Sequence, residues 1–314
     1  MTYSDVHTAL KNKGTEIGHY HQGTRISNSR ALSNAVSNGF CAGASLAWVR
    51  RVLLGGSAKE GPEDSHSAVA FLAQKASARD EFYNNRKTAL NSAFNNVTKQ
   101  TNTDLSALNT KAQVILNERL PKLSAQEQND LIDKVQESLN KQSNAIKARG
   151  QEKMDQINSA LKTDSLYDQF WKEFAKVVDQ RLRTSDYSSL TVVRSSCDRR
   201  YGPENGLQKF LGEVLTGKSL APGNAGVVGI TPPTTGATGH AVGVQRVDLQ
   251  LYYFFDPNFG TYAVDARTLL WMFLFLFLKA YPALEDKSSD NHAYEVNGIV
   301  CGEYVIYKGP QSRS

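Results

Sequence analysis

The sequence predicts an α+β fold in which a helical half comes first and an antiparallel sheet follows. Helix-forming residues dominate from Glu63 to Arg149, a span with no glycine and a single proline. Short runs of β-branched and aromatic residues gather after residue 190. Because the helices precede the strands along the chain, we expect a helical layer packed against a sheet, with a cleft between the two.

The composition of the 314-residue chain is ordinary for a globular protein, with 40% hydrophobic and 21% charged residues. The formal net charge is only +5, and the chain has neither an aromatic-interleaved basic patch nor a phosphate-binding Gly-x-x-x-x-Gly-Lys loop. We therefore predict no nucleic-acid partner and no nucleotide or other cofactor. The three cysteines are widely spaced and odd in number, which favours a reducing compartment over a disulfide framework. Cys197 and Cys301 are expected to be structural.

Residues 1–30 are polar and rich in Ser, Thr, Asn and Gln, so we expect a disordered N-terminal tail. The segment lacks the apolar stretch of a cleaved signal peptide, but it is compatible with a non-cleaved signal for a specialised secretion system. His19 and His21 lie in this tail without a third ligand, and no metal site is predicted.

Residues 31–62 are predicted to hold a core helix with a cysteine at its first turn. Cys41 follows Gly39 and Phe40 and precedes a run of helix formers. Unpaired N–H groups and the positive end of the helix dipole favour an anion there, so the pKa of the Cys41 thiol is expected to fall. The small residues Ala42 to Ala44 are expected to keep the approach open. The alternative is a buried cysteine in an ordinary core helix.

Residues 63–163 are predicted to form an inserted antiparallel helical hairpin, broken at Pro121. Ser124 and Glu127 form a capping box at the start of the second helix, and apolar residues recur at spacings of three and four. The apolar seam is too narrow for a deep core. Two interpretations stay open: a solvated helical pair that extends the domain, or a docking surface for a substrate or partner.

Residues 164–310 are predicted to supply the rest of the core. The segment opens with a helix that has a wide apolar face, and a second helix is expected from Pro203 to Leu215. Strands are expected at residues 190–193 and 227–230.

An uncharged apolar run from Leu269 to Leu278 follows, and Asp265 caps its helix. The run has about half the length that a bilayer requires, so it predicts a buried helix and no transmembrane segment. Strands at residues 294–296 and 299–307 are expected to close the sheet.

His240 and Asp256 are the predicted partners of Cys41. His240 lies in a short strand of small residues over 239–246, directly after a flexible loop over 231–239. Asp256 ends the next, aromatic strand at a Pro-Asn-Phe-Gly turn, so two adjacent strands would bring it beside His240. Each residue alone has a plainer interpretation, as a core histidine or a turn aspartate. The order of cysteine, histidine on a strand and acid at the end of the next strand is the papain-like arrangement.

Three motifs surround these residues: Gly-x-Cys-x-x-x-Ser-Leu-x-Trp at Cys41, Gly-His-Ala-Val at His240 and Phe-Asp-Pro-Asn-Phe-Gly at Asp256. Together they resemble the motifs of the YopT-type effector cysteine proteases, papain-fold enzymes that bacteria deliver into host cells. The resemblance implies a papain-like core, with the catalytic helix first and the antiparallel sheet last. It also implies a catalytic triad in which Cys41 is the nucleophile, His240 the general base and acid, and Asp256 the group that orients the imidazole.

The resemblance further implies a polar side chain shortly before the cysteine that helps to bind the oxyanion. Asn34, Ser37 and Asn38 all lie close to Cys41, and Asn38 is the candidate. The backbone N–H of Cys41 is a stronger candidate for an oxyanion donor than Asn38, because N–H groups at a helix N-terminus are free to bind an anion.

The predicted function is that of a thiol protease, a hydrolase acting on peptide bonds. The resemblance implies a secreted effector or toxin with a role in virulence, which reaches a host or target-cell cytoplasm and cleaves a protein there. One alternative is a papain-fold deamidase, transglutaminase or acyltransferase that uses the same triad, because the site and not the fold sets the reaction. A second alternative is a non-enzymatic protein whose hairpin, residues 63–163, binds a partner.

Overall fold

The computed structural model describes residues 1–28, 40–74, 76–160, 163–201, 206–216, 220–231, 239–284 and 300–310. The chain divides into two compact units. The first comprises Met1–Arg79 and Tyr167–Ser314, and the second is Asp80–Leu166.

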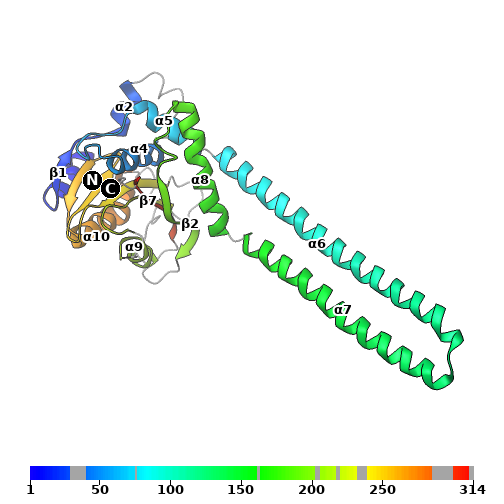
Figure 1. Ribbon diagram of the computed structural model, residues 1–314. Coiled ribbons are helices and arrows are strands. Elements are labelled where there is room, and N and C mark those ends of the chain that lie inside the picture. The colour runs from blue at the N-terminus through cyan, green and yellow to red at the C-terminus, as the bar shows by residue number, and fades with distance from the viewer. Residues whose placement is uncertain are drawn as a thin grey trace. The chain divides into compact units, whose positions relative to one another are not determined.

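A seven-stranded antiparallel sheet lies at the centre of the first unit (Figure 1). The strand order is β1-β6-β5-β4-β3-β7-β2, and each neighbouring pair is antiparallel. Helices and an antiparallel sheet in one unit confirm the α+β class. The strands are β1 (Thr15–Gly18), β2 (Thr191–Tyr201), β3 (Ala225–Thr231), β4 (His240–Arg246), β5 (Tyr252–Asp256), β6 (Gly260–Val264) and β7 (Val300–Lys308).

The apolar run predicted as a buried helix covers one face of the sheet. It forms α10 (Ala266–Phe275), the π-helical turn η2 (Leu276–Ala280) and the short α11 (Tyr281–Leu284). Asp265 caps α10 by accepting a hydrogen bond of 2.7 Å from the Thr268 N–H. Among the described helices, none combines the length and apolarity needed to cross a bilayer. Side chains with no exposed area fill this layer, namely those of Leu269, Met272, Phe273, Leu276 and Phe277.

Helix α4 (Cys41–Leu53) packs on the opposite face of β3, β4 and β5. The Trp48 ring stacks on Phe255 of β5 with centroids 5.3 Å apart. Gly243 of β4 makes this contact close, because a Cβ at that position would lie 2.6 Å from Trp48 Cε3. Helices α5 (Asp64–Gln74) and α9 (Gly206–Thr216) also belong to the first unit, as does most of α8 (Thr163–Leu182).

The predicted elements of the C-terminal half correspond to observed ones. The strands expected at 190–193 and 227–230 fall in β2 and β3, and the helix expected over 203–215 is α9. The last expected strand, 299–307, is β7, while residues 294–296 lie outside the described residues.

The N-terminal segment is ordered, and the prediction of a disordered tail over residues 1–30 is wrong for residues 1–28. It forms α1 (Tyr3–Lys11), β1 and α2 (Gln22–Asn28), and a capping box between Thr2 and Asp5 starts α1. Strand β1 adds to the sheet beside β6. Val6 and Leu10 are fully buried in the main core, and the polar remainder of α1 faces outward, which explains why the composition concealed the helix.

The second unit consists of two long helices, α6 (Ala76–Arg119) and α7 (Ala125–Ala160), joined by the turn η1 (Leu120–Lys122) that contains Pro121. Side chains of both helices line a shared groove, and of residues 101–150 only Gly150 is buried. The hairpin has therefore no deep core. The division falls at Asp80 and not at residue 63, since α5 packs on α4 in the first unit.

Candidate active site

Cys41 is the first residue of α4, as the sequence predicts. Phe40 precedes the helix as its N-cap and supplies no side-chain cap. Cys41 is partly exposed, whereas Gly43 and Ala44 are buried. A Cβ on Gly43 would lie 2.2 Å from the Ser67 backbone oxygen, so the absence of a side chain at this position allows α5 to pack closely on α4. The expectation that Ala42 to Ala44 keep the approach to the thiol open is therefore wrong for Gly43 and Ala44, while Ala42 is partly exposed.

His240 and Asp256 face each other at the same end of the sheet. His240 begins β4 and Asp256 ends β5, and these strands are paired. The His240 Nε2 atom lies 3.1 Å from Asp256 Oδ2. The His240 side chain is 8% exposed and that of Asp256 is fully buried, so their interaction is shielded from water.

The Cys41 thiol and the His240 imidazole are neighbours that interact electrostatically, and each shifts the pKa of the other. Because Nε2 of the imidazole faces Asp256, Nδ1 is the ring nitrogen left for the sulfur. The structure thus joins Cys41, His240 and Asp256 in one chain of contacts, with the imidazole in the middle.

The environment favours the charged forms of both Cys41 and His240. Burial opposes ionisation of the thiol, but hydrogen bonding and charge interaction with His240 hold the Cys41 pKa below its ordinary value. Burial also opposes protonation of the imidazole, yet the charge and hydrogen bond of Asp256, with a smaller effect of Cys41, raise the pKa of His240 to about 10. Both shifts favour a thiolate beside an imidazolium, the form in which cysteine is a nucleophile.

Tyr281, the first residue of α11, is a fourth member of this cluster that the sequence analysis missed. Its hydroxyl lies 2.7 Å from His240 Nε2 and donates to the Asp256 carboxylate, with oxygen distances of 2.8 and 2.7 Å. The side chain is 4% exposed. Contact with the Asp256 charge and burial both raise the pKa of Tyr281, so its hydroxyl keeps the proton that it donates.

Two further polar residues connect the cluster to the N-terminal segment. The Asn258 N–H donates to Asp256 Oδ1 at 2.8 Å, and Gln22 Nε2 donates to Asn258 Oδ1 at 2.9 Å. Gln22 Oε1 in turn accepts from the Phe40 N–H at 3.0 Å, directly before Cys41. Asn258 could be found from the predicted turn after Asp256, whereas no sequence pattern marks Gln22.

The remaining predicted features fall outside the described residues. Asn38, the candidate oxyanion residue, lies with Asn34 and Ser37 in the stretch 29–39, and most of the loop before His240 lies in 232–238. Three potential metal ligands, His7, Glu16 and His19, form a second group of polar side chains.

No known family model matches the sequence, and no curated protein matches it. Among solved structures, the avirulence protein AvrPphB of Pseudomonas is similar at 16% sequence identity and a TM-score of 0.29. The match covers 50% of this chain and 74% of AvrPphB. At this TM-score the likeness supports no conclusion about fold or function.

Proposed function

We propose that this protein is a cysteine protease in which Cys41, His240 and Asp256 form the catalytic triad. The observation that carries the proposal is the buried imidazole of His240, which contacts the thiol on one side and a fully buried carboxylate on the other. Cys41 is a partly exposed residue at a helix N-terminus, where a thiolate is favoured, and Asp256 holds the imidazole beside it. In this proposal the helix and sheet around the cluster form a papain-like core.

The thiolate of Cys41 attacks the carbonyl carbon of the scissile peptide bond, and a C–S bond forms. The imidazolium of His240 then gives its Nδ1 proton to the leaving amine, and the C–N bond breaks to leave an acyl-enzyme. His240 next removes a proton from water, which attacks the acyl carbon. The C–S bond breaks, the carboxylic acid product leaves, and the thiolate and imidazolium are restored.

The oxyanion formed at each tetrahedral stage requires hydrogen-bond donors at about 2.7–3.1 Å. The Cys41 backbone N–H belongs to the first turn of α4, whose N–H groups have no acceptor within the helix. We assign this N–H as one donor and the side chain of Asn38 as the second. The hydrogen bond from the Phe40 N–H to Gln22 fixes the backbone immediately before the donor.

The biological setting proposed here rests on the three sequence motifs. Their resemblance to the YopT-type effectors favours a secreted bacterial virulence effector or toxin that acts on a protein in a host or target-cell cytoplasm. The formal net charge of +5 gives no electrostatic advantage to a polybasic substrate segment. Neutral or acidic protein substrates are therefore favoured over basic ones.

The test compares wild type with Cys41→Ala in a eukaryotic cell, with Cys197→Ala as the matched cysteine control. New protein N-termini are expected with wild type and Cys197→Ala and not with Cys41→Ala. If all three proteins gave the same N-termini and only those with Cys41 damaged the cell, proteolysis would be refuted. The reaction would then be deamidation, transglutamination or another acyl transfer. Equal damage by all three would refute an enzymatic role of Cys41 and leave the non-enzymatic hairpin function.

A further inference from the structure

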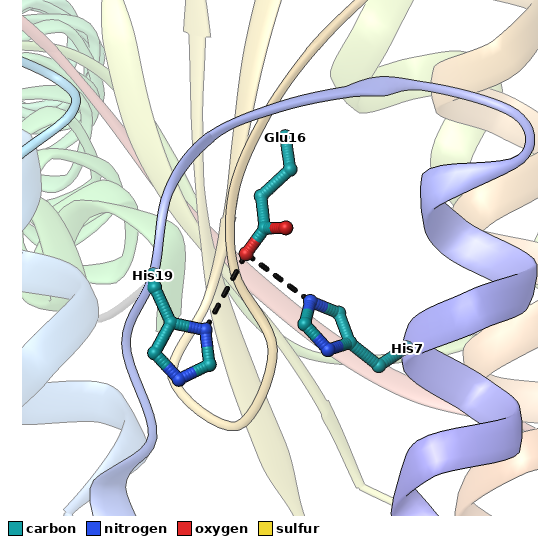
Figure 2. A group of neighbouring side chains, drawn as sticks. All are labelled: His7, Glu16 and His19. Carbon is teal, nitrogen blue, oxygen red and sulfur yellow. Dashed lines mark hydrogen bonds and ion pairs between the residues drawn. The ribbon is translucent and has the colours of Figure 1, made fainter.

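His7, Glu16 and His19 form a cluster of potential ligands in the N-terminal segment (Figure 2). His7 comes from α1, Glu16 from β1, and His19 directly follows β1. Both imidazoles point at the same carboxylate oxygen: His7 Nε2 lies 3.1 Å and His19 Nδ1 lies 3.4 Å from Glu16 Oε1. We propose that these three side chains bind a divalent transition-metal ion of the zinc type.

The spacing of the ligand atoms fits a tetrahedral ion. Zinc binds imidazole nitrogen and carboxylate oxygen at about 2.0–2.2 Å, so two ligand atoms of a tetrahedral site are about 3.3–3.5 Å apart. The two measured separations of 3.1 and 3.4 Å agree with that value. All three ligand atoms lie within 4.8 Å of one another, and the ion draws the two nitrogens together.

Rigid elements hold two of the ligands, and the third is free to adjust. The Thr2–Asp5 capping box and the buried side chains of Val6 and Leu10 fix the helix that carries His7. Glu16 is opposite Tyr262 in the sheet, and its side chain is 15% exposed. The side chain of His19 is 73% exposed, so this ligand can rotate onto an ion that enters from solvent.

The donor set selects the class of ion. Two neutral imidazoles and one carboxylate suit zinc and its neighbours among the divalent transition metals, while calcium and magnesium prefer oxygen ligands. Three protein ligands leave the fourth tetrahedral position for a water molecule. On binding, each neutral imidazole would turn an unprotonated nitrogen to the ion and keep its proton on the other ring nitrogen, so that the ion replaces the two contacts with Glu16 Oε1.

The positive charge of Lys11 should weaken binding of the ion, so its removal is a test in which the affinity is expected to rise. Its Nζ atom lies 2.8 Å from Glu16 Oε2, the carboxylate oxygen that faces away from the imidazoles. The lysine leaves Oε1 to the ion, but its positive charge repels a cation. Removal of Lys11 should therefore strengthen binding, by about tenfold at most for an exposed charge.

An ion at this cluster would fasten the N-terminal segment to the edge of the sheet. Gly260 has φ of +92°, and a Cβ there would lie 2.3 Å from the Gly18 oxygen and 3.2 Å from the His19 Cα, so the ligand segment rests directly on β6. Farther along the same segment, Gln22 bonds to Asn258 and to the Phe40 N–H. Binding should therefore stabilise the fold around the cluster of Cys41, whatever reaction that cluster performs.

The experiment titrates zinc chloride into the metal-free full chain by calorimetry, in the Cys41→Ala background to remove thiolate binding at the candidate active site. One equivalent of zinc should bind. Either His7→Ala or His19→Ala should lower the zinc affinity about 100-fold, since even the loss of a group that only hydrogen-bonds to a metal ligand lowers metal affinity 10- to 100-fold. His66→Ala, a histidine on α5 outside the cluster, is the matched control and should bind as the parent does.

A second measurement follows the midpoint of thermal unfolding. At about 100 times the dissociation constant, zinc should raise the midpoint by several degrees in the parent and in His66→Ala, and not in His19→Ala. Because His19 is exposed, that variant keeps the fold. Lys11→Ala should bind more tightly than the parent. The proposal would be overturned if His7→Ala and His19→Ala bound zinc as tightly as the parent. It would also be overturned if His66→Ala lowered the zinc affinity as much as those two variants do.

Discussion

The hydroxyl of Tyr281 supports the buried charge of Asp256, and Tyr281→Phe removes that hydroxyl while retaining the ring. The hydroxyl donates to a carboxylate with no solvent exposure, at 2.7 and 2.8 Å. A hydrogen bond to a charged group contributes about 1.5–3 kcal/mol, because the charge has no water to replace the lost donor. We expect the free energy of unfolding to fall by that amount in urea titrations at pH 7.

Tyr262→Phe is the matched control. Tyr262 is also fully buried, but its hydroxyl donates to the neutral Phe259 carbonyl at 3.0 Å, away from the imidazole. Its loss should cost about 0.5–1.5 kcal/mol, the net value of a neutral hydrogen bond. The two variants therefore remove the same atom from two environments that differ in charge.

The rate of Cys41 alkylation by iodoacetamide across pH separates a positioning role of Tyr281 from a structural one. When the hydroxyl no longer joins His240 to Asp256, the imidazole is held less firmly beside the sulfur, and the Cys41 pKa should rise toward its ordinary value. The midpoint of the alkylation profile should move to higher pH in Tyr281→Phe and stay unchanged in Tyr262→Phe. Equal stability losses with identical profiles in the two variants would refute the role assigned to Tyr281.

Three further predictions concern His240 and the packing of Gly243. In His240→Ala, the Cys41 pKa should rise because the charge and hydrogen bond of the imidazole are lost, while burial and the backbone hydrogen bonds with Ala42 and Ala241 remain. For each unit by which the pKa rises, alkylation on the acidic side should slow about threefold, because the tenfold loss of thiolate is partly offset by its greater nucleophilicity. Since the pKa of His240 is raised to about 10, its contribution to stability is present in full below pH 6.5 and is lost as pH rises toward 10, which urea titrations of wild type against His240→Gln should show. Gly243→Ala should cost about 1–3 kcal/mol in urea because the new Cβ meets the Trp48 ring at 2.6 Å, whereas Gly229→Ala meets only the flexible Glu303 chain and should cost less.

The sequence was sufficient to find elements whose local pattern is strong. The break at Pro121, the buried helix after Asp265 and the start of α4 at Cys41 all lie where periodicity and capping residues indicate. His240 and Asp256 come together because one begins β4 and the other ends β5, and antiparallel neighbours bring such ends to the same edge. Their catalytic role stays a prediction.

The rest of the cluster depends on tertiary packing that local patterns do not contain. Tyr281 reaches Asp256 only because the apolar helix packs on one particular face of the sheet. Gln22 lies 236 residues from Asn258 in the chain, and neither flanking sequence marks the contact. The N-terminal helix was missed because only Val6 and Leu10 enter the core, too few for a visible apolar stripe.

Burial opposes the charged forms of Cys41 and His240, so the cluster depends on the partners that offset it. A carboxylate without solvent exposure is tolerated only when donors surround it, and Asp256 receives them from Asn258, Tyr281 and His240. Gln22 ties this group to the backbone before Cys41. Reactivity of the thiol and stability of the N-terminal segment should therefore change together, since any substitution that breaks the hydrogen bonds of Gln22 loosens both the Asp256 partners and the start of α4.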